Sequence, residues 1–134
     1  MKVELMKCDV MNANRRIYPK AVVEKIAEQI NNRKAPLPIA IPDDGGSEVT
    51  LFAEFKNVVG FVTHAEIVDG TLMVEADPRN NTRFTAEQIT ELLEDKSFVL
   101  RFRGTGQVDN TLGASMITDA TITAVDFLPK EQGS

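Results

Sequence analysis

The sequence is poor in the residues that build metal clusters and disulfides. Its 134 residues include one cysteine, Cys8, and one histidine, His64. A single cysteine excludes an internal disulfide and a cysteine-based zinc cluster, so we expect Cys8 to be a small strand residue. No uninterrupted apolar run approaches the ~20 residues that cross a bilayer, and no phosphate-binding glycine loop or dinucleotide fingerprint is present. We therefore expect no membrane span, no metal and no cofactor.

The charge balance argues against nucleic acid as a partner. The 15 basic and 20 acidic side chains give a formal net charge of -5, so the field of the whole molecule repels phosphate backbones. The one basic cluster, Arg15 and Arg16 with Lys20, lies around an expected turn and lacks the interleaved aromatic residues of a single-strand binding platform. The first residues lack the apolar segment of a signal peptide, so the expected compartment is a cytoplasm.

Length and pattern favour one domain over residues 1–129, followed by a flexible tail over residues 130–134. The expected helices begin near Pro19 and Thr85, and the expected strands span residues 2–10, 48–55, 58–68, 71–76, 97–103, 114–117 and 120–128. These strands and helices do not alternate as βαβ units. The expected fold class is therefore α+β, a small curled antiparallel sheet or β-barrel of about seven strands with two flanking helices.

Two elements have strong local signals. The dipeptide Asp69-Gly70 lies between two β-rich runs and predicts a hairpin. Thr85 and Gln88 predict a capping box at the start of the second helix, with Phe84 and Ile89 at hydrophobic-staple positions.

Prolines and glycines predict less regular structure elsewhere. The apolar segment 37–42 contains Pro38 and Pro42, which confine it to a sheet edge or to irregular extended structure. Residues 43–47 are expected to form a loop. Gly104 and Gly106 are expected to hold a turn open after the strand 97–103.

The run from Asp9 to Lys20 joins the first expected strand to the first helix. Within it, the pattern N-x-N-x-R-[IVL]-Y-P is supplied by Asn12, Asn14, Arg16, Ile17, Tyr18 and Pro19. This pattern resembles the N-terminal signature of tailed-phage prohead proteases, which trim capsid and scaffold proteins during head maturation. The resemblance implies a small β-barrel flanked by helices, similar to herpesvirus assemblins.

The resemblance extends over most of the chain. Val59-Gly60-Phe61-Val62 and Asp69-Gly70 match a strand entry and a turn of the family, and Val125-Asp126 echoes its closing strand. Residues 101–106 keep the Arg-Gly-x-Gly part of the family's nucleophile segment. These matches all fall where the sequence pattern places strands or turns.

The family's catalytic residues are replaced. The His-Pro dipeptide that carries the base corresponds to Ile41-Pro42, and the two serines of the S-S-R-G-x-G segment correspond to Arg101 and Phe102. Isoleucine accepts no proton, and neither arginine nor phenylalanine attacks a carbonyl carbon. We therefore expect no enzymatic activity and no catalytic, cofactor-binding or metal-binding residues.

Other residues could substitute for the lost pair, and each has a simpler interpretation. His64 is expected to be a half-exposed strand residue beside Glu66, with Val62 and Val68 on the same face. Thr105 is the only hydroxyl of the Arg-Gly segment and would still need a base within about 3 Å. Solvent-facing or turn positions are expected for Ser97 and Ser115, and loop or helix-end positions without a metal are expected for Asp43, Asp44, Asp77, Glu94 and Asp95.

The favoured hypothesis is a non-catalytic phage structural protein, either a capsid decoration or a head-assembly protein. It would bind the major capsid protein and neighbouring copies of itself, with no nucleic acid, membrane or small-molecule substrate. Its location would be the virion capsid, assembled in the host cytoplasm. The segment Leu37–Val49 would supply an edge for strand pairing. The alternatives are an active prohead serine-type peptidase with a displaced catalytic set and a host-directed phage accessory protein.

Overall fold

The computed structural model describes residues 1–12, 15–42, 57–110 and 115–133; for residues 132 and 133 it describes the backbone only. The strands are β1 (Lys2–Lys7), β2 (Arg16–Ile17), β3 (Leu37–Ala40), β4 (Val58–Val68), β5 (Thr71–Pro78), β6 (Phe98–Asp109) and β7 (Ser115–Pro129), and the helices are α1 (Lys20–Asn31), α2 (Ala86–Glu94) and α3 (Lys130–Gly133). Among the described residues, no helix has the length and apolar character needed to cross a membrane.

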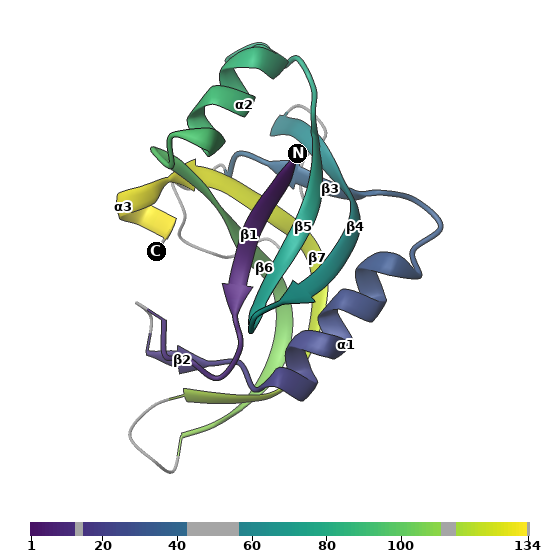
Figure 1. The fold of residues 1–134 in the computed structure, drawn as a ribbon, viewed down its shortest axis with the longest axis vertical. Helices are drawn as coiled ribbons and strands as arrows, with labels where there is room; N and C mark the ends of the chain where they lie inside the picture. Colours follow the sequence, from purple (N-terminus) through teal and green to yellow (C-terminus); the bar gives the residue numbers. More distant parts are fainter. Residues whose placement is uncertain (13–14, 43–56, 111–114, 134) are drawn as a thin grey trace.

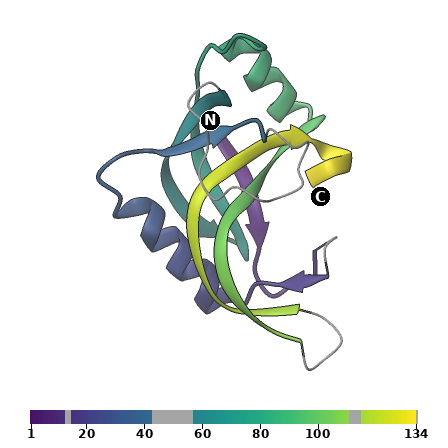
Figure 2. The same cartoon turned by 180° about the vertical axis from the view of Figure 1, so that it is seen from behind.

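One curled sheet of seven strands organises the molecule. The strand order is β1-β5-β4-β3-β7-β2, and β6 pairs with β7. Paired strands are antiparallel except that β7 runs parallel to both β2 and β3. Helix α1 packs against β4 and β7, and α2 covers the opposite end of the sheet (Figure 1). The long, bent β6–β7 ribbon is seen best from behind (Figure 2). This architecture confirms the expected α+β fold.

The core is a cluster of buried side chains from the sheet, α1 and α2. Helix α1 buries one stripe of side chains: Val22, Val23, Ile26, Ala27 and Ile30. Near α2, the ring of Phe127 stacks on Phe98 at a centroid distance of 4.6 Å and meets Phe84 edge-on at 5.7 Å. The residue expected to staple the start of α2 is thus part of an aromatic cluster that ties the helix to β6 and β7.

Two amide side chains of α1 take the place of strand backbone where the sheet has no neighbouring strand. The Gln29 amide donates to the Ala120 carbonyl at 2.9 Å and accepts from the Ile122 N–H at 2.9 Å. Asn31 makes the same pair of bonds to Ala65 of β4, at 2.9 and 2.8 Å. The helix therefore satisfies backbone groups on both sides of the short strand β3.

The local signals in the sequence are confirmed. Asp69 and Gly70 adopt φ angles of 50° and 77°, which are the positive values that a tight hairpin turn requires at both central residues. The Thr85 hydroxyl accepts from the Gln88 N–H at 3.1 Å, and the Gln88 side chain accepts from the Thr85 N–H at 2.9 Å. Ile89 follows as a buried residue of α2.

The expectation of an edge or irregular segment over residues 37–42 is wrong for β3. This strand lies inside the sheet, antiparallel to β4 and parallel to β7. It pairs with β7 only at Ile39 and Ala40, so Pro38 precedes that ladder and its missing N–H removes no bond from it. Leu37 is fully buried. The remainder of the expected docking edge, residues 43–49, and the expected strand 48–55 lie outside the described residues.

The C-terminal half is more regular than the sequence suggested. Strand β6 continues through Gly104 and Gly106 to Asp109, and β7 is one strand in place of two shorter ones. The tail expected to be flexible forms α3, which begins with the Lys130 N–H donating to the Ser97 carbonyl at 3.0 Å.

Candidate functional site

The positions that the sequence motifs align with the base and nucleophile of prohead proteases lie near each other in the sheet. Ala40, which precedes Ile41, pairs with Asp126 on β7, and Asp126 pairs with Arg101 on β6. The two positions are therefore two strands apart, or about 10 Å at the usual strand spacing. Ile41 itself is half-buried against the core, and its N–H donates to the Asn57 carbonyl at 3.0 Å.

Arg101 belongs to a buried ionic cluster. Its guanidinium donates to Oδ2 of Asp126 from Nη2 at 2.6 Å and from Nε at 3.1 Å. Arg103 donates from Nε to Oδ1 of the same carboxylate at 2.7 Å. The side chain of Asp126 is 2% exposed and that of Arg101 is 21% exposed. One of the two nucleophile positions thus holds a cation that is fixed by a buried carboxylate.

Phe102 occupies the second nucleophile position and packs inward. Its ring lies 5.9 Å from the ring of Tyr18, tilted by 60°. Tyr18 comes from the Asn-x-Asn-x-Arg-Ile-Tyr-Pro run, so the two sequence motifs that carry the resemblance meet at this contact. Sequence reasoning did not foresee that meeting, because it depends on how β6 bends toward β2.

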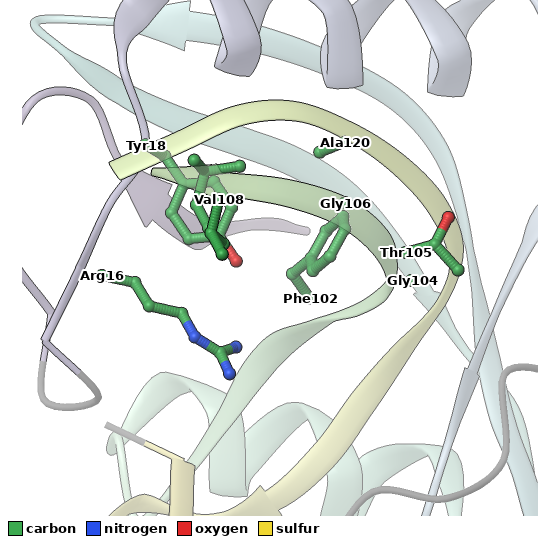
Figure 3. A pocket seen from close by; sticks show the side chains of 9 residues that line it. Arg16, Tyr18, Phe102, Gly104, Thr105, Gly106, Val108 and Ala120 are labelled. Carbon is green, nitrogen blue, oxygen red and sulfur yellow. The ribbon is translucent and has the colours of Figure 1, made fainter. Parts of the chain in front are cut away.

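A hollow of about 200 Å³ opens beside this contact. Its lining residues come from three strands and the residue after β2: Arg16 and Tyr18, then Phe102, Gly104, Thr105, Gly106 and Val108 of β6, then Ile117 and Ala120 of β7. Figure 3 shows the side chains of Arg16, Tyr18, Phe102 and Val108 around the hollow.

The environment of Tyr18 is apolar with one neighbouring cation. Burial raises the pKa of Tyr18 above its ordinary value, and the Arg16 guanidinium opposes this rise through its charge and a side-chain hydrogen bond. Arg16 was expected to be part of a solvated basic turn. It is exposed, and it also lines the hollow.

Gly104 and Gly106 serve close packing, which corrects the expectation that they hold a turn open. Neither has a positive φ angle. A Cβ atom on Gly104 would overlap the Thr121 carbonyl oxygen of β7 and would lie 2.8 Å from the tip of the Phe102 ring. A Cβ atom on Gly106 would lie 2.7 Å from the Asp119 carbonyl oxygen. Because these glycines have no side chain, the backbone of β7 can lie close to β6, and the ring of Phe102 can lie over Gly104.

The remaining candidates are not assembled into a catalytic set. His64 is exposed on β4, and a bulge after Val62 places that valine inside and His64 outside, so the two do not share a face as expected. Glu66 pairs with Lys2 at 2.5 Å, and this partner lowers the pKa of Glu66. Thr105 is exposed and lines the hollow, and the described residues that line the hollow with it include no histidine.

Among the described residues, Cys8 and the carboxylates provide no built metal site. Cys8 is buried just after β1, and burial raises the pKa of its thiol. Asp77 pairs with Arg79 at 2.7 Å, and Asp95 accepts from the Ser97 hydroxyl at 2.6 Å. In the part of the chain that the structure describes, no three histidine, cysteine or acidic side chains are grouped so that they could hold a metal ion. Asp43 and Asp44 lie outside that part.

Comparison with known proteins agrees with the fold that the motifs implied. No family model matches the sequence, and no curated protein matches it significantly. The solved structure of the bacteriophage T4 capsid assembly protease, gp21, is similar to this chain with a TM-score of 0.70 and 15% sequence identity, over 96% of this chain and 79% of that one. The protein therefore has the prohead-protease-like fold that its sequence motifs predicted.

Proposed function

We propose that this protein is a non-catalytic phage head-assembly protein that binds the major capsid protein. One observation carries the proposal: the positions that the sequence motifs align with the base and nucleophile of prohead proteases hold Ile41, Arg101 and Phe102. Arg101 is fixed by Asp126, and Phe102 packs against Tyr18. These side chains hold structural contacts where a peptidase of this fold would need reactive groups.

The chemistry of serine-type peptidases supports the same conclusion. Such an enzyme needs a hydroxyl group within hydrogen-bond reach of a base, together with donors for the oxyanion. The one histidine of the chain, His64, is exposed on β4 and does not line the hollow that holds Thr105. A displaced catalytic set would have to bring these two residues together.

Binding to the capsid shell fits the charge of the molecule. The net charge of -5 disfavours contact with packaged DNA, so a protein surface is the better partner. Many symmetric copies on a shell tolerate weak individual affinity when neighbouring copies also touch. The protein would then be located in the virion capsid after assembly in the host cytoplasm.

The proposal is tested by mixing the purified protein with assembled capsids, as binding partners, and with capsid and scaffold proteins, as peptidase substrates. With major capsid and scaffold proteins, we expect co-sedimentation with assembled capsids and no cleavage of either protein. A fluorophosphonate probe should label no residue. Labelling of a serine or threonine that is lost in His64→Ala would establish a displaced catalytic set and contradict the proposal, as would a protein that stays in the supernatant at every capsid concentration.

A further inference from the structure

We propose that the hollow between β2, β6 and β7 binds one aromatic side chain of an extended segment of a partner protein. This inference rests on the proposed function, because it names the surface through which a non-catalytic protein of this fold would bind.

The size of the hollow limits its occupant. Its volume of about 200 Å³ lies below the roughly 300–1,000 Å³ of sites that enclose cofactors or drug-sized ligands. At roughly 30 Å³ for each water molecule, this volume corresponds to about seven waters, which one large side chain would displace. The hollow therefore suits a single side chain.

The walls favour an aromatic ring. The rings of Tyr18 and Phe102 have centroids 5.9 Å apart and are tilted by 60°, which lies within the distance range of interacting aromatic pairs. A third ring entering beside them would make contacts of the same kind. Val108 adds an apolar surface that is 50% exposed in the described chain. Apolar burial and ring packing would thus act together on one guest side chain.

The charge of Arg16 selects among large side chains. Arg16 carries the one formal charge among the described residues that line the hollow. A guanidinium attracts the negative face of an aromatic ring and repels a lysine or arginine side chain. A carboxylate would be attracted to Arg16 but would lose hydration against Phe102 and Val108, which an uncharged ring would not.

The backbone beside the hollow provides a place for the rest of the segment. Thr105, Gly106, Gln107 and Val108 are exposed in succession along β6. In the described ranges β6 pairs with β7 alone, and β1 lies beside part of β6 without pairing with it. An added strand would therefore pair along the exposed residues of β6. Strand addition supplies backbone hydrogen bonds, while a pocket for one side chain supplies the selectivity.

Tyr18 provides a built-in reporter for the test. The chain contains one tyrosine and no tryptophan, so its intrinsic fluorescence comes from the wall of the hollow. The probes are three blocked pentapeptides, acetyl-Thr-Thr-Xaa-Thr-Thr-amide, with Phe, Ala or Glu at the central position. We expect the Phe peptide to change the Tyr18 fluorescence saturably and to bind at least tenfold more tightly than the other two. A Glu peptide that binds as tightly as the Phe peptide, or no saturable change with any peptide, overturns the inference.

Matched variants locate the binding. Val108→Lys places a cation and a long stem at the hollow and should weaken binding of the Phe peptide at least tenfold. Val68→Lys makes the same change at a residue that is 45% exposed beside the β4–β5 turn and should leave binding unchanged. Arg16→Gln should weaken binding a few-fold. Both lysine substitutions are at exposed sites, and unchanged melting curves would confirm that the variants fold. Equal binding of the Phe peptide by wild type and Val108→Lys would contradict the proposed site.

Mass spectrometry of the peptide after incubation tests the proposed function separately from this inference, because it shows whether the peptide has been cleaved. After incubation, the peptide is expected to be intact. A cleaved peptide would contradict the non-catalytic function, while an intact peptide that does not bind would overturn only the aromatic site.

Discussion

Asp126 shows how one residue stabilises the region that would hold the chemistry of a peptidase. Its buried carboxylate accepts from two guanidiniums that approach from the neighbouring strand. Removal of one partner of a buried ionic cluster leaves charges that are neither hydrated nor balanced. The cluster is therefore sensitive to the loss of the Asp126 carboxylate, which joins β6 to β7 beside Phe102.

We expect Asp126→Asn to lower the free energy of unfolding by about 3–5 kcal/mol, because Arg101 and Arg103 both lose their ion pair with this buried carboxylate. Urea denaturation measures the loss. Asp119→Asn removes a carboxylate that pairs with Lys25 at the surface and serves as the control, with a much smaller effect. Similar losses for the two variants would contradict the buried role of Asp126.

We expect the phenol of Tyr18 to lose its proton at a higher pH than a free tyrosine does. Burial raises its pKa above the ordinary value of 10.0, so the folded chain holds the phenol proton more tightly than the unfolded chain. This difference stabilises the folded state at a pH below the ordinary pKa of tyrosine. The stabilisation is lost as the pH rises through the pKa that Tyr18 has in the folded state. Because the chain has no other tyrosine and no tryptophan, absorbance at alkaline pH follows this group alone.

The expected midpoint lies above that of a free tyrosine, and Arg16→Gln should raise it further because Arg16 lowers the pKa of Tyr18. Lys34→Gln removes an exposed cation outside the hollow and should leave the midpoint unchanged. A midpoint in wild type at or below the ordinary value would show that the phenol is solvated.

Helix α1 supplies hydrogen bonds to β7 at positions where β3 does not pair with it. Strand β3 is only four residues long, and Gln29 bonds to β7 where β3 does not. A side-chain amide carries both a donor and an acceptor, so it can replace one peptide group of a strand. The element thus closes the sheet as well as burying its apolar stripe.

Gln29→Leu should cost about 1–3 kcal/mol for each backbone group left without its partner, since the Ala120 carbonyl and the Ile122 N–H both lose a bond. Hydrogen exchange at the Ile122 amide should also become faster. Glu24→Leu introduces the same side chain at an exposed position of α1 and controls for helix propensity. Unchanged exchange at Ile122 in Gln29→Leu would contradict this role.

The elements that the sequence predicted are those fixed by near neighbours. The Asp69-Gly70 hairpin and the Thr85 capping box depend on contacts within a few residues, and both form as expected. The interior position of β3 depends on where β7 pairs with it, and the proline rule considers one strand in isolation. The bond between Arg101 and Asp126 joins residues 25 positions apart, so it required the strand register.

At the scale of the whole molecule, one core joins residues from β1 to β7 and both longer helices. No disulfide is possible with one cysteine, and the described residues contain no grouped metal ligands. We therefore expect one cooperative melting transition that is unchanged by EDTA or by a thiol reductant, as calorimetry would record. A large loss of stability with the chelator would contradict this account.

The whole-molecule proposal joins a prohead-protease-like fold to binding without catalysis. A binding component of the shell stays with the particle, whereas a maturation enzyme acts during assembly and need not remain. Copy number in the finished virion therefore distinguishes the two roles.

Quantitative mass spectrometry of purified virions is the most direct test of this claim. We predict that the intact protein is present in a fixed ratio to the major capsid protein. Its absence from mature particles, or its presence only in immature heads that contain scaffold, would contradict the account and favour a transient assembly or peptidase role.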